Sequence, residues 1–194
     1  MHTACLHNCL EAVEMMMVEC PQLCILKDSC GSIPVMEAAR SNSVKIVDLL
    51  CQTDPSWPKL QDSVGRNTLH VASHSGHVEV IELLVRQQKM DPNDASCPSR
   101  PLHWAAKEGQ VQAVTCLLEM GADPTAEDLG GRIPLALAIG GQHVEAARVL
   151  VRHDPLLPFD VTLLAFARTA SMKQMLSETF QSLWNIVLYL PGTD

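Results

Sequence analysis

The amino-terminal segment holds a group of residues that could bind a metal ion. Two cysteine pairs with a spacing of four residues stand beside two histidines: Cys5 and Cys9, Cys20 and Cys24, His2 and His7. Four thiolates on two helical turns are a ligand set that a tetrahedral zinc ion accepts. The group is therefore a candidate structural metal site.

A second pattern suggests nucleophilic chemistry. Cys97 stands six residues before His103, and a thiol activated by a nearby base is a common nucleophile. The glycine pairs Gly130-Gly131 and Gly140-Gly141 follow no predicted strand, so they do not indicate a phosphate-binding loop. Whether either cysteine group is a site depends on the elements that hold it.

An internal repeat predicts those elements. Five alanines recur at spacings of 34, 34, 33 and 33 residues: Ala4, Ala38, Ala72, Ala105 and Ala138. Four similar blocks, three with proline near the start, predict the first turn of a helix, where proline loses no hydrogen bond: 33–38, 67–72, 100–105 and 133–138. Apolar pairs eleven and twelve residues after each alanine predict the buried stripe of a second helix: Met15-Met16, Leu49-Leu50, Leu83-Leu84, Cys116-Leu117 and Val149-Leu150.

With these blocks and this period, the sequence resembles the ankyrin-repeat family over residues 1–155. The resemblance implies an all-α solenoid of about four to five repeats, each a β-turn finger with two antiparallel helices, plus a C-terminal capping helix. The finger at 95–99 lacks the glycine found at Gly31, Gly65 and Gly131, so we expect a different hairpin there. The expected units are a partial repeat at 1–27, repeats at 28–61, 62–94, 95–127 and 128–155, and a degenerate cap with an amphipathic helix at 156–194.

The repeat register assigns structural roles to the reactive residues. Cys5 aligns with a small buried residue of the first helix, and Cys51 takes a buried aliphatic position where free cysteine acts as a small hydrophobe. His103 recurs as His70 and is interpreted as a turn residue. We therefore expect no metal, no cofactor and no catalytic residue, while an enzyme that uses the cysteines remains an alternative.

Composition bounds the class of protein and its surroundings. The chain has 194 residues with a formal charge of −8, which opposes general binding to nucleic acid. No apolar run reaches the roughly 18 residues of a membrane span, and Glu11 and Glu14 interrupt any signal peptide. We expect an intracellular monomer, cytoplasmic or nuclear, with eight free cysteines.

The resemblance also implies where a partner binds, because ankyrin repeats vary at finger tips and on the exposed face of the first helix. The expected partner-binding residues are Arg40, Arg66, His74, Trp104, Lys107, Glu108, Leu129 and Arg132. The basic members Arg40, Arg66, Lys107 and Arg132 are expected to form a positive stripe on the concave side that attracts an acidic segment. An ordinary solvated surface is the alternative.

The predicted function is a non-catalytic protein-interaction module, acting as an adaptor, a scaffold or an inhibitor. One alternative is an ankyrin-type cyclin-dependent-kinase inhibitor, which 100–109 resembles except at Trp104. Another is a substrate-recruiting subunit of a cullin ubiquitin ligase, in which the helix from Met172 to Val187 would bind a partner and not cap the array. Asn93 resembles an asparagine that hydroxylases modify in this family, and the chain is either complete or a fragment or isoform of a longer array.

Overall fold

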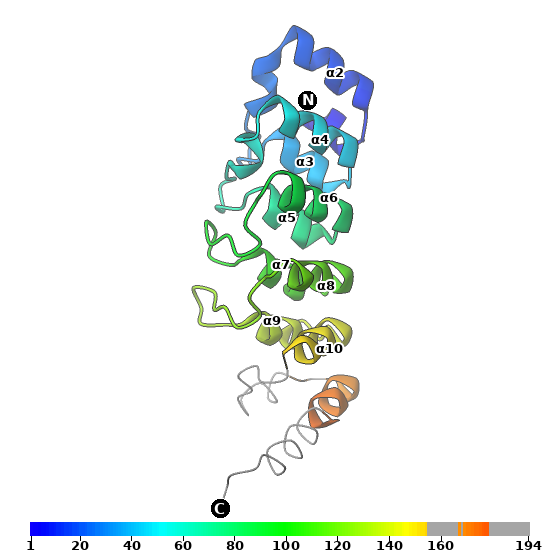
Figure 1. Cartoon of the computed structure of the whole chain (residues 1–194), viewed down its shortest axis with the longest axis vertical. Helices are drawn as coiled ribbons and strands as arrows, with labels where there is room; N and C mark the ends of the chain where they lie inside the picture. Colours follow the sequence, from blue (N-terminus) through cyan, green and yellow to red (C-terminus); the bar gives the residue numbers. More distant parts are fainter. Residues whose placement is uncertain (155–166, 168, 179–194) are drawn as a thin grey trace, which may run out of the picture.

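The chain forms a solenoid of helix pairs stacked along one long axis, with loops projecting to one side (Figure 1). The computed structural model describes residues 1–154, 167 and 169–178. The pairs are α1 (His2–Leu6) with α2 (Leu10–Glu19), α3 (Pro34–Arg40) with α4 (Val44–Thr53), α5 (Thr68–Ser75) with α6 (Val78–Glu82), α7 (Pro101–Lys107) with α8 (Val111–Glu119), and α9 (Pro134–Gly140) with α10 (Val144–His153). The predicted all-α solenoid is confirmed.

Short helical turns complete the pairs. The turn η1 (Pro21–Ile25) follows α2, η2 (Trp57–Lys59) lies in the long loop after α4, and the π-helical turn η3 (Leu83–Gln87) extends α6. Residues 170–178 are also helical, and the described part of the chain contains no strand.

The first helices begin where the sequence predicts. Pro34, Pro101 and Pro134 each occupy the first turn of a helix, where an amide would have no partner. The helix α5 has no proline and is capped by Asn67, whose Oδ1 accepts the backbone N–H groups of Leu69 and His70. Local chemistry thus fixes the start of the first helix in the four repeats that contain α3, α5, α7 and α9.

The turn within each pair needs a left-handed residue. The backbone φ is positive at Asn8, Asn42, Gly76, Gly109 and Gln142, which occupy the same place in successive repeats. Glycine and asparagine adopt this conformation at low cost. In the last pair the positive φ falls on Gln142 and not on the glycines before it.

The fingers form a row beside the helices. Each begins with an aspartate whose carboxylate accepts the N–H two residues later: Asp28, Asp62, Asp94 and Asp128. Ser63 N–H donates to Cys30 O at 3.1 Å, and Leu129 N–H donates to Pro98 O at 3.1 Å. The third finger differs, as its missing glycine predicts, because Cys97 Sγ contacts Val64 O at 3.8 Å where the first two fingers share a backbone hydrogen bond.

A continuous core runs between the two rows of helices. The repeated alanines Ala38, Ala72, Ala105 and Ala138 are fully buried, and their small side chains allow close packing of neighbouring first helices. In the second helices Leu50, Leu84, Leu117 and Leu150 are fully buried. The predicted burial is thus confirmed for the second member of each pair in these four repeats, whereas the first members Leu49 and Val149 are only partly buried.

The predicted burial of Met15 is wrong. Its side chain is 66% exposed, and Met16 is only half-buried. The reason is the position of α2 at the end of the stack (Figure 1), since a stripe of this kind is covered by the neighbouring second helix. Only Val13 of α2 is fully buried.

The other end of the stack is covered by described residues. Met172, Met175 and Leu176 are buried in the same core as the α9/α10 pair, and Thr169 N–H donates to Gln142 Oε1 at 3.0 Å. Ala167 is also buried. Most of the rest of the predicted cap and C-terminal helix lies outside the described residues, and this part includes residues 162–166 and 180–187.

Candidate partner-binding surface

The structure assigns most of the reactive residues to the core. Cys5 and Cys51 are fully buried and Cys116 nearly so, as the repeat register predicts. Burial raises the pKa of Cys5 and of Cys51 to about 12 and that of Cys116 to about 11, so these thiols carry no charge at neutral pH. Among the described residues, no three side chains of the ligand types His, Cys, Asp and Glu are grouped closely enough to hold a metal ion.

The histidines of the repeat motif join neighbouring repeats. His103 is buried, and its Nε2–H donates to Arg132 O of the next finger at 2.9 Å. His77 Nε2–H donates in the same way to Arg40 O of the preceding repeat at 2.9 Å. Cys97 lies against Val64 O. The two members of the candidate cysteine–histidine pair, Cys97 and His103, thus each make a structural contact with a neighbouring finger.

Trp104 is the centre of a different group, on the side of the array formed by the first helices. Its indole is half-buried on α7, and Nε1–H donates to Ser99 O at 3.2 Å. The guanidinium carbon of Arg66 lies 5.4 Å from the ring centroid, and Lys107 Nζ lies 5.1 Å from it. Both distances are within the range of cation–π attraction, which holds the two cations against the ring.

His74 completes this group from the last turn of α5. Its ring meets the indole edge-on, with centroids 5.6 Å apart and an angle of 78° between planes, and His74 Nδ1 is 3.6 Å from Glu108 Oε1. Burial lowers the pKa of His74, with Glu108 opposing and nearby cations assisting that shift, so the ring is mainly neutral at pH 7. The structure thus brings together five predicted binding residues, here called the Trp104 cluster: Arg66, His74, Trp104, Lys107 and Glu108.

Local sequence explains how the cluster is positioned. Trp104, Lys107 and Glu108 are spaced by three and four residues, which places them on one face of α7 and its last turn. Arg66 comes from the second finger, where its Nε–H donates to Asp62 Oδ2 at 2.8 Å. Two adjacent repeats therefore build one surface.

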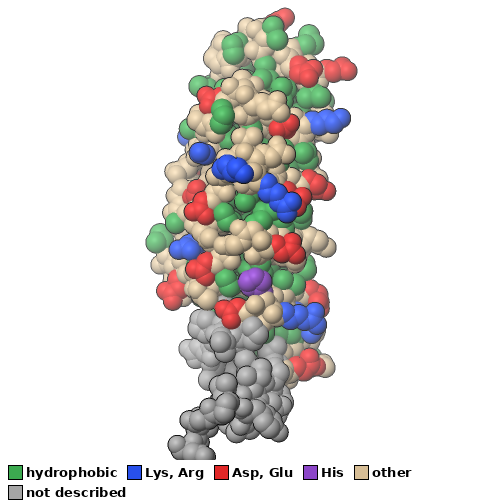
Figure 2. Space-filling view, viewed as in Figure 1, with side chains coloured by type: hydrophobic (Ala, Val, Ile, Leu, Met, Phe, Trp, Pro, Cys, Tyr) green, Lys and Arg blue, Asp and Glu red, His purple; other side chains and the backbone are tan. Residues whose placement is uncertain are grey.

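The predicted positive stripe is not a row of free cations. Arg40 pairs with Glu37 at 3.4 Å, Arg66 with Asp62 at 2.8 Å, and Arg132 with Asp128 at 2.8 Å. In the part of the chain that the structure describes, Lys107 is the one member of the four without an ion pair. Figure 2 likewise shows acidic and basic side chains interspersed over the face in view.

Sequence reasoning overlooked Asp62 and Asp128, which neutralise two of these arginines. Burial alone would raise the pKa of each carboxyl, but hydrogen bonds from Arg66 or Arg132 and from the finger amides outweigh it, so the pKa is lowered. Both aspartates are therefore ionised at neutral pH. The spacing of four residues between aspartate and arginine, repeated in both fingers, was the signal for these pairs.

The remaining predicted binding residues lie apart from the indole. Leu129 is 86% exposed in the fourth finger, next to the pair formed by Asp128 and Arg132. Arg40 is close enough to His74 to affect its charge but contacts Glu37. The predicted residues thus form the Trp104 cluster and outlying contacts on either side.

Asn93 connects two loops and is partly exposed. Its Nδ2–H donates to Gly121 O at 2.9 Å, and its Oδ1 accepts Asp123 N–H at 2.8 Å. The amide therefore holds neighbouring repeats together.

Comparisons with known proteins agree with this architecture. Residues 1–96 and 87–163 match the family described as ankyrin repeats (3 copies). Human Rabankyrin-5 is 47% identical over 56 residues, which is 29% of this chain and 5% of that protein. The rice potassium channel AKT3 is 44% identical over 57 residues, 28% of this chain and 6% of that protein.

The human transient receptor potential cation channel subfamily A member 1 is 36% identical over 53 residues, 27% of this chain and 5% of that protein. The chain thus spans only a small part of the curated relatives it matches. Among the described residues, no helix has both the length and the apolar character that a membrane crossing needs.

The family match covers most of the chain, and ankyrin repeats generally act as non-catalytic modules that bind other proteins. The chain belongs to the ankyrin-repeat family.

Proposed function

We propose that this chain is a non-catalytic adaptor, scaffold or inhibitor that binds a protein partner through the concave surface centred on the Trp104 cluster. The observation that carries the proposal is the half-buried indole of Trp104 with two cations at 5.4 and 5.1 Å. Tryptophan and arginine are enriched at the energetic centres of protein interfaces, because they combine a large apolar area with directed polar contacts.

Lys107 is proposed to bind an acidic residue of the partner. Its side chain is exposed, and its ammonium group has no carboxylate partner among the described residues. Arg66 and Arg132 are less suited to this role, because Asp62 and Asp128 already bind them at 2.8 Å. An acidic segment that lies along α7 can pair with Lys107 while its apolar atoms pack on the indole.

Further features of the proposal follow from the charge of the chain. The net charge of −8 favours a protein partner over nucleic acid. We place this interaction inside the cell, because eight unpaired cysteines suit a reducing compartment. We also expect the chain to bind its partner as a monomer.

The experiment compares immobilised variants in a cell extract by quantitative mass spectrometry. Lys107→Glu reverses the unpaired cation, Trp104→Ala removes the ring, and Lys45→Glu makes the same charge change on α4, away from the cluster. Captured partners should be retained by wild type and Lys45→Glu and depleted at least about tenfold by the other two variants, since an interface centre contributes about 1.4 kcal/mol or more.

Two controls make the result interpretable. Circular dichroism should show equal helix content for Lys107→Glu and wild type, since an exposed substitution changes stability by less than about 0.5 kcal/mol. Capture by Lys107→Glu should remain reduced at low salt, where charge attraction is strongest. If the same proteins bind all four forms equally, the Trp104 cluster is not the binding surface.

A further inference from the structure

Three sulfur-containing side chains line one shallow depression on the outer side of α2. They are Met15, Met16 and Cys20, here called the sulfur cluster, and Ala12 and Leu23 form part of the same wall. Met15 is 66% exposed, while Met16 and Cys20 are partly buried. An ion from solvent can therefore reach the depression that the three side chains share.

The end of α2 holds two members of the cluster one helical turn apart. The backbone N–H of Cys20 donates to Met16 O at 2.9 Å. The same spacing of four residues in and after α8 brings Cys116 Sγ to 4.0 Å from Met120 Sδ, so a thiol and a thioether at this spacing can meet. Methionine is flexible enough to move its sulfur atom toward a ligand.

Cys20 differs from the other cysteines that the sequence offers as zinc ligands. Cys5 and Cys24 are buried in the core, and Cys9 Sγ–H donates to His7 O at 3.6 Å. The Cys20 thiol is partly exposed and has no hydrogen-bond partner within residues 1–154, 167 and 169–178. Cys20 is therefore free to bind an ion, but not as part of a four-cysteine site.

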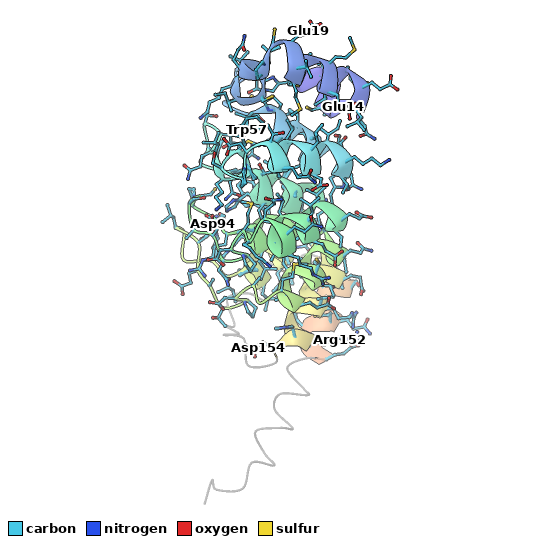
Figure 3. All side chains as sticks on the ribbon, turned by 45° about the horizontal axis from the view of Figure 1, so that its top comes forward. Glu14, Glu19, Trp57, Asp94, Arg152 and Asp154 are labelled. Atoms are coloured by element: carbon cyan, nitrogen blue, oxygen red, sulfur yellow. The ribbon has the colours of Figure 1, made fainter. Side chains whose placement is uncertain are left out.

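Acidic side chains border the sulfur cluster. Glu19 lies at the depression itself and Glu14 at its continuation along α2, and Figure 3 shows both on the helix at the end of the stack. Neither carboxylate forms an ion pair with a residue that the structure describes. Their uncompensated negative charge attracts a cation to this end of the molecule.

The types of donor atom select the metal. Thioether and thiolate sulfur atoms are soft ligands that suit Cu(I), whereas zinc sites use thiolates, imidazoles and carboxylates. One thiolate and two neutral thioethers also cancel the single charge of Cu(I). The same three ligands would leave a net positive charge on a zinc ion, and an apolar depression disfavours such a charge.

We propose that the sulfur cluster binds one Cu(I) ion through Cys20 Sγ, Met16 Sδ and Met15 Sδ. The thiol of Cys20 gives up its proton to solvent as the copper–sulfur bond forms, and neither the metal nor the protein changes its oxidation state. Glu14 and Glu19 favour the approach of the ion by their charge.

The test titrates the full chain with Cu(I) in the absence of oxygen, in competition with the copper-specific dye bathocuproine disulfonate. The tightest binding should saturate at one ion per chain. Cys20→Ser and Met16→Leu should each weaken it by at least about tenfold, because even the loss of an outer-shell partner of a metal ligand costs about that much. Met15→Leu should have an effect in the same direction.

The chain offers a matched control for each type of ligand. Met17→Leu removes a thioether that packs on the core and not in the depression, and Cys30→Ser removes an exposed thiol of the first finger. Both should leave the affinity for Cu(I) unchanged. Leucine keeps nearly the volume of methionine, so circular dichroism should show equal helix content for the methionine variants and wild type.

X-ray absorption at the copper edge provides an independent measurement. It should detect sulfur ligands alone, with fewer of them in Met16→Leu than in wild type. An unchanged affinity in Cys20→Ser would overturn the proposal, as would an equal loss in Cys30→Ser. If both Met15→Leu and Met16→Leu bind as tightly as wild type, a single thiol holds the ion and the three-sulfur site does not exist. Tighter binding of zinc than of Cu(I) at Cys20 would contradict the choice of metal.

Discussion

His70 illustrates how a single residue couples the fold to pH. Its ring is fully buried, and Nδ1–H donates to Asn67 Oδ1 at 2.7 Å. Burial lowers the pKa of His70 from 6.5 to about 4, although Asp94 partly opposes the shift. The protonated ring therefore fits the unfolded chain better than the folded one.

We expect this histidine to reduce stability in acid. Because the folded pKa lies below the unfolded value, the stabilising contribution is complete above pH 6.5 and is lost as the pH falls toward 4. The loss amounts to about 2 to 3 kcal/mol at pH 4.5. Urea unfolding of wild type and His70→Gln at pH 7.5 and 4.5 measures it.

The variant serves as the reference in this measurement. His70→Gln keeps an amide donor without a titrating group, so it should be less stable at pH 7.5 but lose less stability on acidification. His103, whose pKa burial also lowers, remains in both proteins and contributes equally. Parallel pH profiles for the two proteins would show that the pKa of His70 is the same in the folded and the unfolded chain, and the explanation would fail.

At the scale of one element, the finger depends on a glycine for two separate reasons. Gly31 and Gly131 occupy the same place in the first and fourth fingers, with φ of 75° and 69°. A Cβ at Gly31 would lie 2.7 Å from the backbone nitrogen of Ser63, whereas a Cβ at Gly131 meets no described atom within 4 Å. An added side chain would therefore be strained by the positive φ at both sites, but it would collide with a described neighbouring atom only at Gly31.

Alanine substitutions should separate these costs. Gly131→Ala should destabilise by about 1 kcal/mol through the left-handed conformation alone. Gly31→Ala should cost at least about 1 kcal/mol more, because the finger must move away from Ser63 N and weaken the bond to Cys30 O. Denaturant midpoints provide the comparison, and equal costs would mean that the fingers separate freely.

The elements were largely predictable from sequence because their signals are local. The proline blocks and the leucine stripes each lie within one repeat, and the same signal recurs in every period. The Trp104 cluster was predicted as a set of exposed positions, yet the contact of Arg66 with an indole 38 positions later depends on how two repeats stack.

Two features escaped the sequence reasoning for physical reasons. Whether Met15 is buried or exposed depends on a neighbouring helix pair and not on its own helix. Its position in the repeat therefore could not predict that it is exposed. Arg66 and Asp62 are four residues apart, but they lie in a finger and not in a helix, so the rule for helical pairs gives no reason to expect their ion pair. The repeat boundaries themselves stay predictions.

For the whole molecule, the extensive contacts between the described helix pairs join neighbours along the stack (Figure 1). The stability of such an array is approximately a sum of terms within repeats and between adjacent repeats. Leu117 of α8 is fully buried between α6 and α10, whereas Met16 at the same place in α2 is half-buried. Stability should therefore be uneven along the chain, with the α1/α2 pair opening most easily.

Leu117→Ala tests this picture of the whole molecule. Removing a fully buried leucine costs about 2 to 5 kcal/mol, because a cavity remains where packing was lost. Hydrogen exchange should accelerate most in α8 and next in α6 and α10. It should change little in α2, which we expect to exchange fastest among the second helices, because α4 and α6 lie between α2 and the cavity. An equal acceleration in every helix would mean that the array unfolds only as one unit. A graded response would show that the solenoid is stabilised by free energies within each helix pair and between adjacent pairs.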